Sequence, residues 1–373
     1  DENAKMALAR ALVVVGENDD LQTVFQLGQL DAATIRAIAS RKRPKFDVSG
    51  FLESLCASKH VEDSVAAIEL AAKWRIRELY QTAIRLAQNS QADPQLRSAA
   101  MRAMGALGNQ KTTPLLKIMA GNPADPKPAA IIGLLEVDRA AAAKSAANIL
   151  EGTTQNEAIR KILSAFASRE GGGLLLAKEL VKRKINHTQG KRLQDAWIAT
   201  GFVQEAITEA LQAITGWPAE GLKFNEEVVR GMVAAGRKGD RARGEILFES
   251  ARAGCMACHK IGNQGGMIGP ELSAVGSGVP ADRIVTEVLW PARQVKGGYA
   301  LSRITMRDGR VLQGYLQKSR DKKLLLLRDF AGAGMHEVEA EMVTKEEPIG
   351  SLMPPTAQSL SRDELSDLFA YLF

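Results

Sequence analysis

The chain has 373 residues, of which 45% are hydrophobic, 25% are charged and only 5% are aromatic, and its formal net charge is +6. This length suits two or three domains, and abundant Ala and Leu favour helices. Charged residues interrupt every apolar run before it reaches the ~18–20 residues of a membrane span, so we expect none. Lys and Arg are spread among nearly as many acidic residues, without a basic stripe that contains aromatic side chains, so we expect no nucleic-acid partner.

From Lys5 to about Val233 the chain reads as one amphipathic helix after another, with short breaks rich in Gly, Asn, Asp or Pro. Helices are predicted to start near Asp93, Pro126, Thr154 and His187. This spacing of roughly thirty residues fits a pair of helices per repeat. The pattern resembles HEAT-like repeats, so we expect residues 1–236 to form an α-solenoid. Its extended surface either docks another protein or domain, or the solenoid is a plain helical spacer without a partner.

The repeat pattern stops at "AAGRKGDRARG" (234–244), where Gly and basic residues cluster, and the second domain is predicted to cover 237–373. After two helical segments, apolar and polar residues begin to alternate, as they do in β-strands. The segment "YALSRITMRDGRVLQGYLQKS" predicts two strands joined at Asp308-Gly309, a tight turn in which both central residues have positive φ. A small antiparallel β-unit at about 299–346 is therefore expected before a final helix. The overall fold class is mainly α.

Two of the three cysteines, Cys255 and Cys258, are followed at once by His259 in "CMACH". C-x-x-C-H is the spacing of c-type haem attachment, because two nearby thiols can add to the vinyl groups of one porphyrin while the histidine binds its iron. A zinc site is an alternative, but it needs four ligands, and the remaining cysteine, Cys56, lies in the helical repeats. A thioredoxin-like redox pair and a chance occurrence are further alternatives, since three fixed residues alone are a weak pattern.

The surrounding segments resemble class I cytochrome c. They are "GPEL" at 269–272, "RGEILF" at 243–248, "SLMPP" at 351–355 and "LSDLFAYLF" at 365–373. The resemblance implies that the carbonyl group of Pro270 accepts the Nδ1 proton of His259, that Leu272 lines the haem, and that Met353 is the sixth ligand of the iron. It also implies that the first and last helices of the domain cross at Gly244.

The order of these motifs, with a "WPA" turn and "DGRVLQG" between them, looks like the haem-binding domain expanded in Planctomycetes and Verrucomicrobia. This resemblance implies one covalent haem c, with Cys255 and Cys258 as attachment points and His259 and Met353 as iron ligands. Residues that flank the turn are further candidates, as donors to the haem propionates: Arg283, Trp290, Arg293 and Tyr299.

The function that follows is that of an exported, periplasmic electron-transfer module, although the chain carries no export signal. It is expected to accept electrons from a fused or separate dehydrogenase and to pass them to another cytochrome or an oxidase. With both axial positions taken, an electron carrier is favoured over an enzyme. The alternatives are a haem enzyme such as a peroxidase, and a docking scaffold in which the haem is a redox sensor or a structural staple.

Overall fold

The chain is mainly helical with a small antiparallel sheet, and it divides into two compact units. The computed structural model describes residues 2–28, 30–215, 224–250, 253–295, 299–319, 323–328, 335–353, 355, 357 and 360–373. The first unit contains residues 1–166 and 174–185, and the second contains residues 167–173 and 186–373. In the described part of the chain, no helix is both long enough and apolar enough to cross a membrane.

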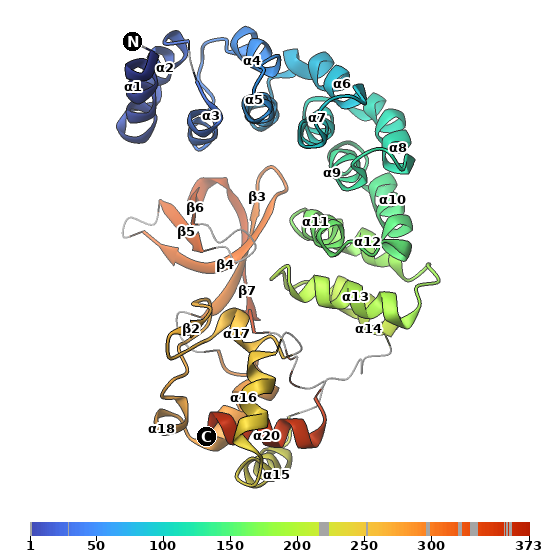
Figure 1. The fold of residues 1–373 in the computed structure, drawn as a ribbon, viewed down its shortest axis with the longest axis vertical. Coiled ribbons are helices and arrows are strands. Elements are labelled where there is room, and N and C mark those ends of the chain that lie inside the picture. The colour runs from blue at the N-terminus through green and yellow to red at the C-terminus, as the bar shows by residue number, and fades with distance from the viewer. Residues whose placement is uncertain are drawn as a thin grey trace. The chain divides into compact units, whose positions relative to one another are not determined.

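The first unit is built of successive α-helices joined by short loops (Figure 1). Its helices are α1 (Glu2–Val15), α2 (Leu21–Gln26), α3 (Ala32–Ile38), α4 (Ser49–Cys56), α5 (Val61–Trp74), α6 (Tyr80–Gln88), α7 (Pro94–Leu107), α8 (Thr113–Gly121), α9 (Lys127–Val137), α10 (Arg139–Gly152), α11 (Asn156–Ala167) and α12 (Gly172–Leu180). Short 3₁₀ helices are η1 (Asn18–Asp20), η2 (Arg77–Leu79) and η3 (Gln110–Thr112). Helices α3, α5, α7 and α9 pack one against the next, and α4, α6 and α8 pack against this row.

The predicted helix starts are confirmed to within two residues. Helices α7, α9, α11 and α13 begin at Pro94, Lys127, Asn156 and His187. Local chemistry explains the starts: the Asp93 carboxylate accepts a hydrogen bond from the amide of Gln95, and a proline occupies the first helical position. The Asn186 side chain caps α13 in the same way.

Two glycines set the closest helix contact of the first unit. A β-carbon on Gly105 of α7 would lie 2.1 Å from the carbonyl oxygen of Gly133 on α9. Real carbon and oxygen atoms do not approach so closely, so only glycine permits this crossing. The buried residues of α7 and α9 include five alanines among larger methionine, leucine and isoleucine side chains, so small residues line part of the contact.

The second unit combines helices with two antiparallel sheets (Figure 1). Its helices are α13 (His187–Ile198), α14 (Glu205–Thr215), α15 (Glu226–Gly236), α16 (Arg241–Glu249), α17 (Cys255–Cys258), α18 (Val275–Gly278), α19 (Ala281–Leu289), η4 (Ala340–Met342) and α20 (Arg362–Leu372). Its strands are β1 (Lys260–Ile261), β2 (Gln264–Gly265), β3 (Ala300–Met306), β4 (Val311–Lys318), β5 (Leu324–Arg328), β6 (Met335–Glu339) and β7 (Val343–Ser351). Strands β1 and β2 pair with each other, and the larger sheet has the order β6-β5-β4-β3-β7.

The larger sheet confirms the predicted β-unit but extends to Ser351, five residues beyond the expected limit. The predicted hairpin between β3 and β4 exists, yet its turn is of another kind. Only Gly309 has a positive φ, at 77°, and Asp308 does not. The loop closes through Gly309 N–H to Met306 O at 2.9 Å and Met306 N–H to Arg310 O at 2.8 Å. This is the pattern of a longer turn that ends in a left-handed glycine, which needs one positive φ rather than two.

The compact units do not divide at 236/237, where the sequence pattern changes. Helices α13 and α14 and the loop at 167–173 belong to the second unit. Hydrogen bonds join this loop, and the loop between the two helices, to the β3–β4 hairpin. The amide of Val311 donates to Ser168 O at 2.9 Å. The buried Gln313 side chain accepts from Val203 N–H at 2.9 Å and donates to Val203 O at 3.0 Å. Contacts between distant segments, which no local pattern records, thus define the second unit.

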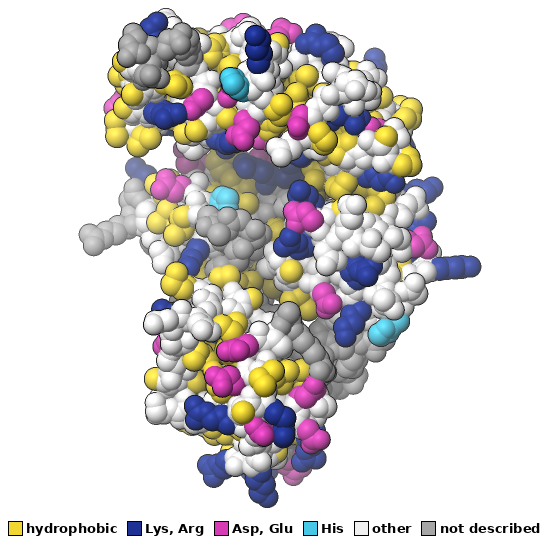
Figure 2. All heavy atoms as spheres, viewed as in Figure 1, with side chains coloured by type: hydrophobic (Ala, Val, Ile, Leu, Met, Phe, Trp, Pro, Cys, Tyr) yellow, Lys and Arg dark blue, Asp and Glu magenta, His cyan; other side chains and the backbone are white. Residues whose placement is uncertain are grey.

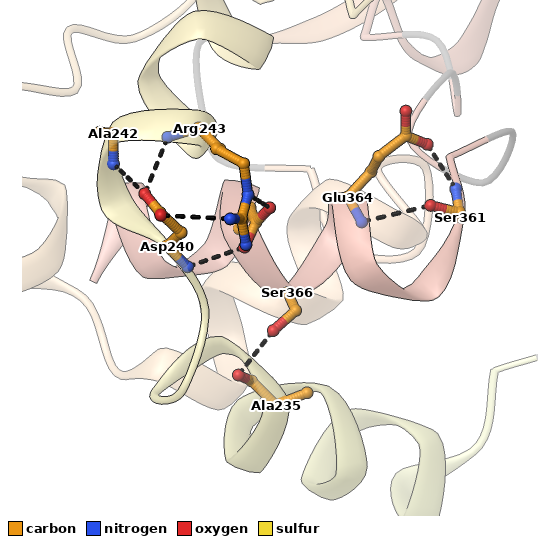
Figure 3. A network of polar contacts seen from close by, with 8 residues as sticks. Ala235, Asp240, Ala242, Arg243, Ser361, Glu364 and Ser366 are labelled. Atoms are coloured by element: carbon orange, nitrogen blue, oxygen red, sulfur yellow. Dashed lines mark hydrogen bonds and ion pairs between the residues drawn. The ribbon is translucent and has the colours of Figure 1, made fainter.

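Helices α16 and α20 form the crossing that the sequence predicted (Figure 3). The Arg243 guanidinium binds both carboxylate oxygens of Asp367, at 2.7 and 3.1 Å. The Ser366 hydroxyl donates to Ala235 O at 2.7 Å, which ties α20 to α15 as well. At its start α20 carries a capping box of Ser361 and Glu364. These hydrogen bonds hold α20 against α15 and α16.

Candidate functional site

The two neighbouring cysteines lie on α17, a helix of a single turn. Gly254 precedes it with a φ of 69°, a left-handed conformation that glycine adopts without strain. The amide of His259 donates to Cys255 O at 2.9 Å, which completes the turn. Residues three apart in a helix share a face, so Cys255 and Cys258 are presented on the same side.

His259 is held by the backbone of the loop that follows. Its Nδ1 atom lies 2.9 Å from the carbonyl oxygen of Pro270. A carbonyl oxygen only accepts, so Nδ1 carries the proton and Nε2 keeps its lone pair in the neutral ring. Burial lowers the pKa of His259, while the bond to Pro270 acts in the opposite direction. The neutral imidazole is therefore favoured, with Nε2 available as a ligand.

Backbone hydrogen bonds join the loop that follows His259 to α17. Gly266 N–H donates to Met256 O, and Gly269 N–H donates to Cys258 O, both at 2.8 Å. A β-carbon on Gly269 would lie 2.6 Å from Cε1 and 2.8 Å from Nδ1 of His259. The Gly-Pro pair therefore has two roles, since the glycine leaves room for the imidazole and the proline carbonyl orients it.

The second unit contains a cavity of about 1200 Å³ at this site. All six site residues that the sequence singled out line it: Cys255, Cys258, His259, Pro270, Leu272 and Met353. Apolar side chains make up much of the remaining wall, among them Phe248, Ile284, Leu360 and Leu368. The volume exceeds that of most small-molecule pockets, which suits a large, flat and largely apolar ligand.

The two thiols are not activated for redox chemistry in this environment. Burial raises the pKa of Cys255 to about 11, and it raises the pKa of Cys258 as well. Catalytic disulfide-forming cysteines have lowered pKa values, because the thiolate is the reactive form. The cavity therefore does not favour the thioredoxin-like alternative. Among the described side chains, no three His, Cys, Asp or Glu residues gather as a metal-binding group.

Met353 reaches the cavity at the end of strand β7, two residues beyond Ser351. Its backbone amide donates to the Ser351 hydroxyl at 3.1 Å. Met267, which is closer to the cysteines in the chain, has 74% of its surface exposed and does not line the cavity. Met306 is buried in the sheet. The structure thus brings the predicted thioether and the predicted imidazole to one cavity.

Only one of the four proposed propionate donors lines the cavity, namely Tyr299. Arg283 instead forms an ion pair with Glu287 at 2.7 Å. The Arg293 guanidinium lies 3.6 Å from the centre of the Phe224 ring. The Trp290 ring packs edge-on against the same phenylalanine, with ring centres 5.2 Å apart. The "WPA" turn therefore packs on Phe224, which is distant from it in the chain.

Sequence reasoning missed two parts of the cavity wall. One is Tyr315 on β4, whose ring centre lies 5.6 Å from that of Tyr299. Burial raises the pKa of Tyr315 to about 12, so its hydroxyl group stays protonated. The other is the polar face of α13, a helix that the sequence assigned to the repeats. The alternation of the β4 sequence indicated a strand, but nothing in it indicated what its tyrosine would contact.

Neither models of protein families nor curated proteins gave a match to this chain. The site itself combines two protonated thiols, an oriented neutral imidazole and a thioether around one large cavity.

Proposed function

We propose that the second unit is a c-type cytochrome domain, in which Cys255 and Cys258 attach one haem covalently and His259 and Met353 bind its iron. The observation that carries this proposal is the joint lining of one cavity by these four side chains. Together they supply the two thiols and the two axial donors that such a cofactor needs.

The residues present fit the group. The bond from Nδ1 to Pro270 leaves Nε2 of His259 as the donor atom, which is the arrangement that orients metal-binding histidines. Burial raises the pKa values of both cysteines, so they stay protonated, and the net addition of each S–H across a vinyl group would place sulfur on one carbon and hydrogen on the other without an oxidant. Leu272, Ile284 and Leu368 supply an apolar wall that excludes water from the cavity.

The role that follows is electron transfer. The bound haem supplies one-electron redox chemistry, and imidazole with thioether ligation favours a relatively high reduction potential. His259 and Met353 would both bind the iron, which would leave no ligand position for oxygen or peroxide. The carbonyl oxygen of Pro270 holds the His259 ring, and the Ser351 hydroxyl accepts from the backbone amide of Met353, so both ligand residues are fixed where they enter the cavity. Electrons come from a dehydrogenase, fused or separate, and go to another cytochrome or an oxidase.

We propose that the first unit is an α-solenoid of HEAT-like repeats that docks a protein partner or domain. Support comes from its row of helices, each packed against the next, and from the glycine crossing of α7 and α9. Positive and negative side chains are interspersed over the visible surface, which favours a partner matched in shape over one attracted by a single sign of charge (Figure 2). Since haem c is attached outside the bacterial inner membrane, we place the protein in the periplasm.

Absorption spectra test the proposal. The chain is produced with a c-type haem assembly system, and wild type is compared with Met353→Ala in oxidised and reduced form. We expect a covalent, low-spin haem in wild type, with the near-infrared band of a thioether bound to ferric iron. Met353→Ala should lose this band and bind added cyanide or imidazole readily.

Met267→Ala is the matched control, because this methionine is exposed and lies outside the cavity wall. It should retain the wild-type spectrum. A wild-type protein that carries no covalent haem would refute the cytochrome proposal. A wild type that is already high-spin and reacts with peroxide would instead favour a haem enzyme.

A further inference from the structure

We propose that Lys191 on α13 binds the haem carboxylates, so that this helix is part of the cofactor site. The inference rests on the proposed function. It extends the site to a helix outside the region that resembles cytochrome c, and it assigns the propionate-binding role to a residue that the sequence placed in the repeats.

The first observation is the division of α13 into two faces. Leu193, Ala196 and Trp197 are buried, and the Trp197 indole donates to Thr208 of α14 at 3.1 Å. The opposite face lines the cavity with residues at helical spacing, His187, Lys191, Gln194, Asp195 and Ile198. The apolar face thus packs on α14, and the polar face forms a wall of the cavity.

The second observation concerns the charge of the wall. Among the described residues that line the cavity, Lys191 is the sole lysine or arginine. Of the two carboxylates there, Glu287 has Arg283 as its partner at 2.7 Å. Asp195 lies one turn from Lys191, and burial raises its pKa while the lysine acts in the opposite direction.

These charges decide which group a haem carboxylate binds. A carboxylate that enters a partly apolar cavity loses water and needs a cation or several hydrogen-bond donors in return. Lys191 supplies the cation, with the Gln194 amide one turn away on the same face and the Tyr299 hydroxyl elsewhere on the wall. Beside the cysteines, His259 and Met353, the described lining contains no lysine or arginine.

Two readouts on holoprotein test the inference. One is the midpoint potential at neutral pH, and the other is the resonance Raman band of the haem carboxylate bending mode, which responds to hydrogen bonds at that group. Lys191→Gln should lower the potential, because ferric iron carries one more positive charge than ferrous iron and a nearby cation favours the reduced form. It should also shift the carboxylate band. Asp195→Asn should raise the potential.

Lys191→Arg should keep both readouts near wild type, and Lys117→Gln, at an exposed lysine of α8, is the matched control. An unchanged carboxylate band in Lys191→Gln would overturn the inference, whatever the potential does. That result would leave the cytochrome proposal intact provided the wild-type spectrum has the covalent haem and the thioether band. Absence of covalent haem in wild type would instead refute the proposed function itself.

Discussion

Gly244 lies so close to Asp367 that a β-carbon on the glycine would be 2.0 Å from the carbonyl oxygen of the aspartate. Helices α16 and α20 therefore cross backbone to backbone, and Phe248 and Leu368 are buried beside the crossing. The ring centre of Tyr371 lies 5.6 Å from that of Phe248. This crossing positions one end of the cavity wall, because Phe248 and Leu368 both line it.

Gly244→Ala should destabilise the second unit by about 3 kcal/mol, the upper end of the usual cost of overpacking, because the opposing atoms are backbone and cannot move alone. Chemical denaturation followed by circular dichroism measures the change. Gly231→Ala is the matched control, since a β-carbon there meets nothing within 4 Å and alanine favours a helix. Equal stability of the two variants would contradict the close crossing.

Gly269→Ala should reduce the fraction of protein that acquires a covalent, low-spin haem. The added methyl group would overlap the His259 ring, at 2.6 Å from Cε1, and force the imidazole away from its Pro270 partner. Haem content per protein, from the reduced pyridine complex, measures the effect. Gly278→Ala, where a β-carbon has open space, should behave like wild type. Full haem content with a normal spectrum in Gly269→Ala would show that the glycine is not needed.

The stability contributed by the Arg243–Asp367 pair should depend on pH. Hydrogen bonds from the Arg243 side chain and the Asp240 amide hold the pKa of Asp367 below its usual range. The pair therefore stabilises the fold above about pH 4, the ordinary pKa of the group, and this contribution is lost as the pH falls toward the lowered value. Near neutral pH, Asp367→Asn should cost about 1 kcal/mol.

Thermal unfolding at a series of pH values measures the pH dependence of the stability that the Arg243–Asp367 pair contributes. The difference between wild type and Asp367→Asn should shrink below about pH 4. Glu341→Gln, at an exposed position, is the control and should give no such trend. A difference that stays constant from pH 7 to pH 3 would mean that the pair contributes no charge-dependent stability.

Gln313→Met should loosen the link between strand β4 and the α13–α14 loop. The buried amide makes two hydrogen bonds with the backbone of Val203, and methionine keeps the volume while losing both. Loss of these bonds should cost about 1–3 kcal/mol. Hydrogen exchange of the Val203 amide is the direct measurement, and its protection should fall. Gln317→Met, on the same strand but exposed, should leave exchange at Val203 unchanged.

Features that depend on near neighbours in the chain were predictable. The helix starts at Pro94 and His187 and the capping box at Ser361 follow from short motifs, and the resemblance to cytochrome c implied the bond from His259 to Pro270. Within such a motif, the residues that decide the geometry lie within a dozen positions of one another.

Features that join distant segments were predictable only where the resemblance to cytochrome c implied them, as at the crossing of α16 and α20. A polar face has the same helical spacing whether it meets solvent or lines a cavity, so the sequence did not show that Lys191 lines the cavity. Arg293 and Trp290 pack on Phe224, which is far from them in the sequence. The turn at Asp308 was mistaken for a two-residue turn because the Asp-Gly pair occurs in both kinds.

The chain enters the sheet of β3 to β7 and leaves it at neighbouring positions. Ala300, at the start of β3, and Ser351, at the end of β7, are paired across the two strands. A segment whose ends adjoin can change length in its outer part, away from the β3–β4 contacts with the rest of the unit, without moving the chain on either side of it. Met353 follows this junction by two residues, so its position is independent of the length of that outer part. The domain can therefore evolve new surfaces on the sheet while its proposed axial ligand stays where it is.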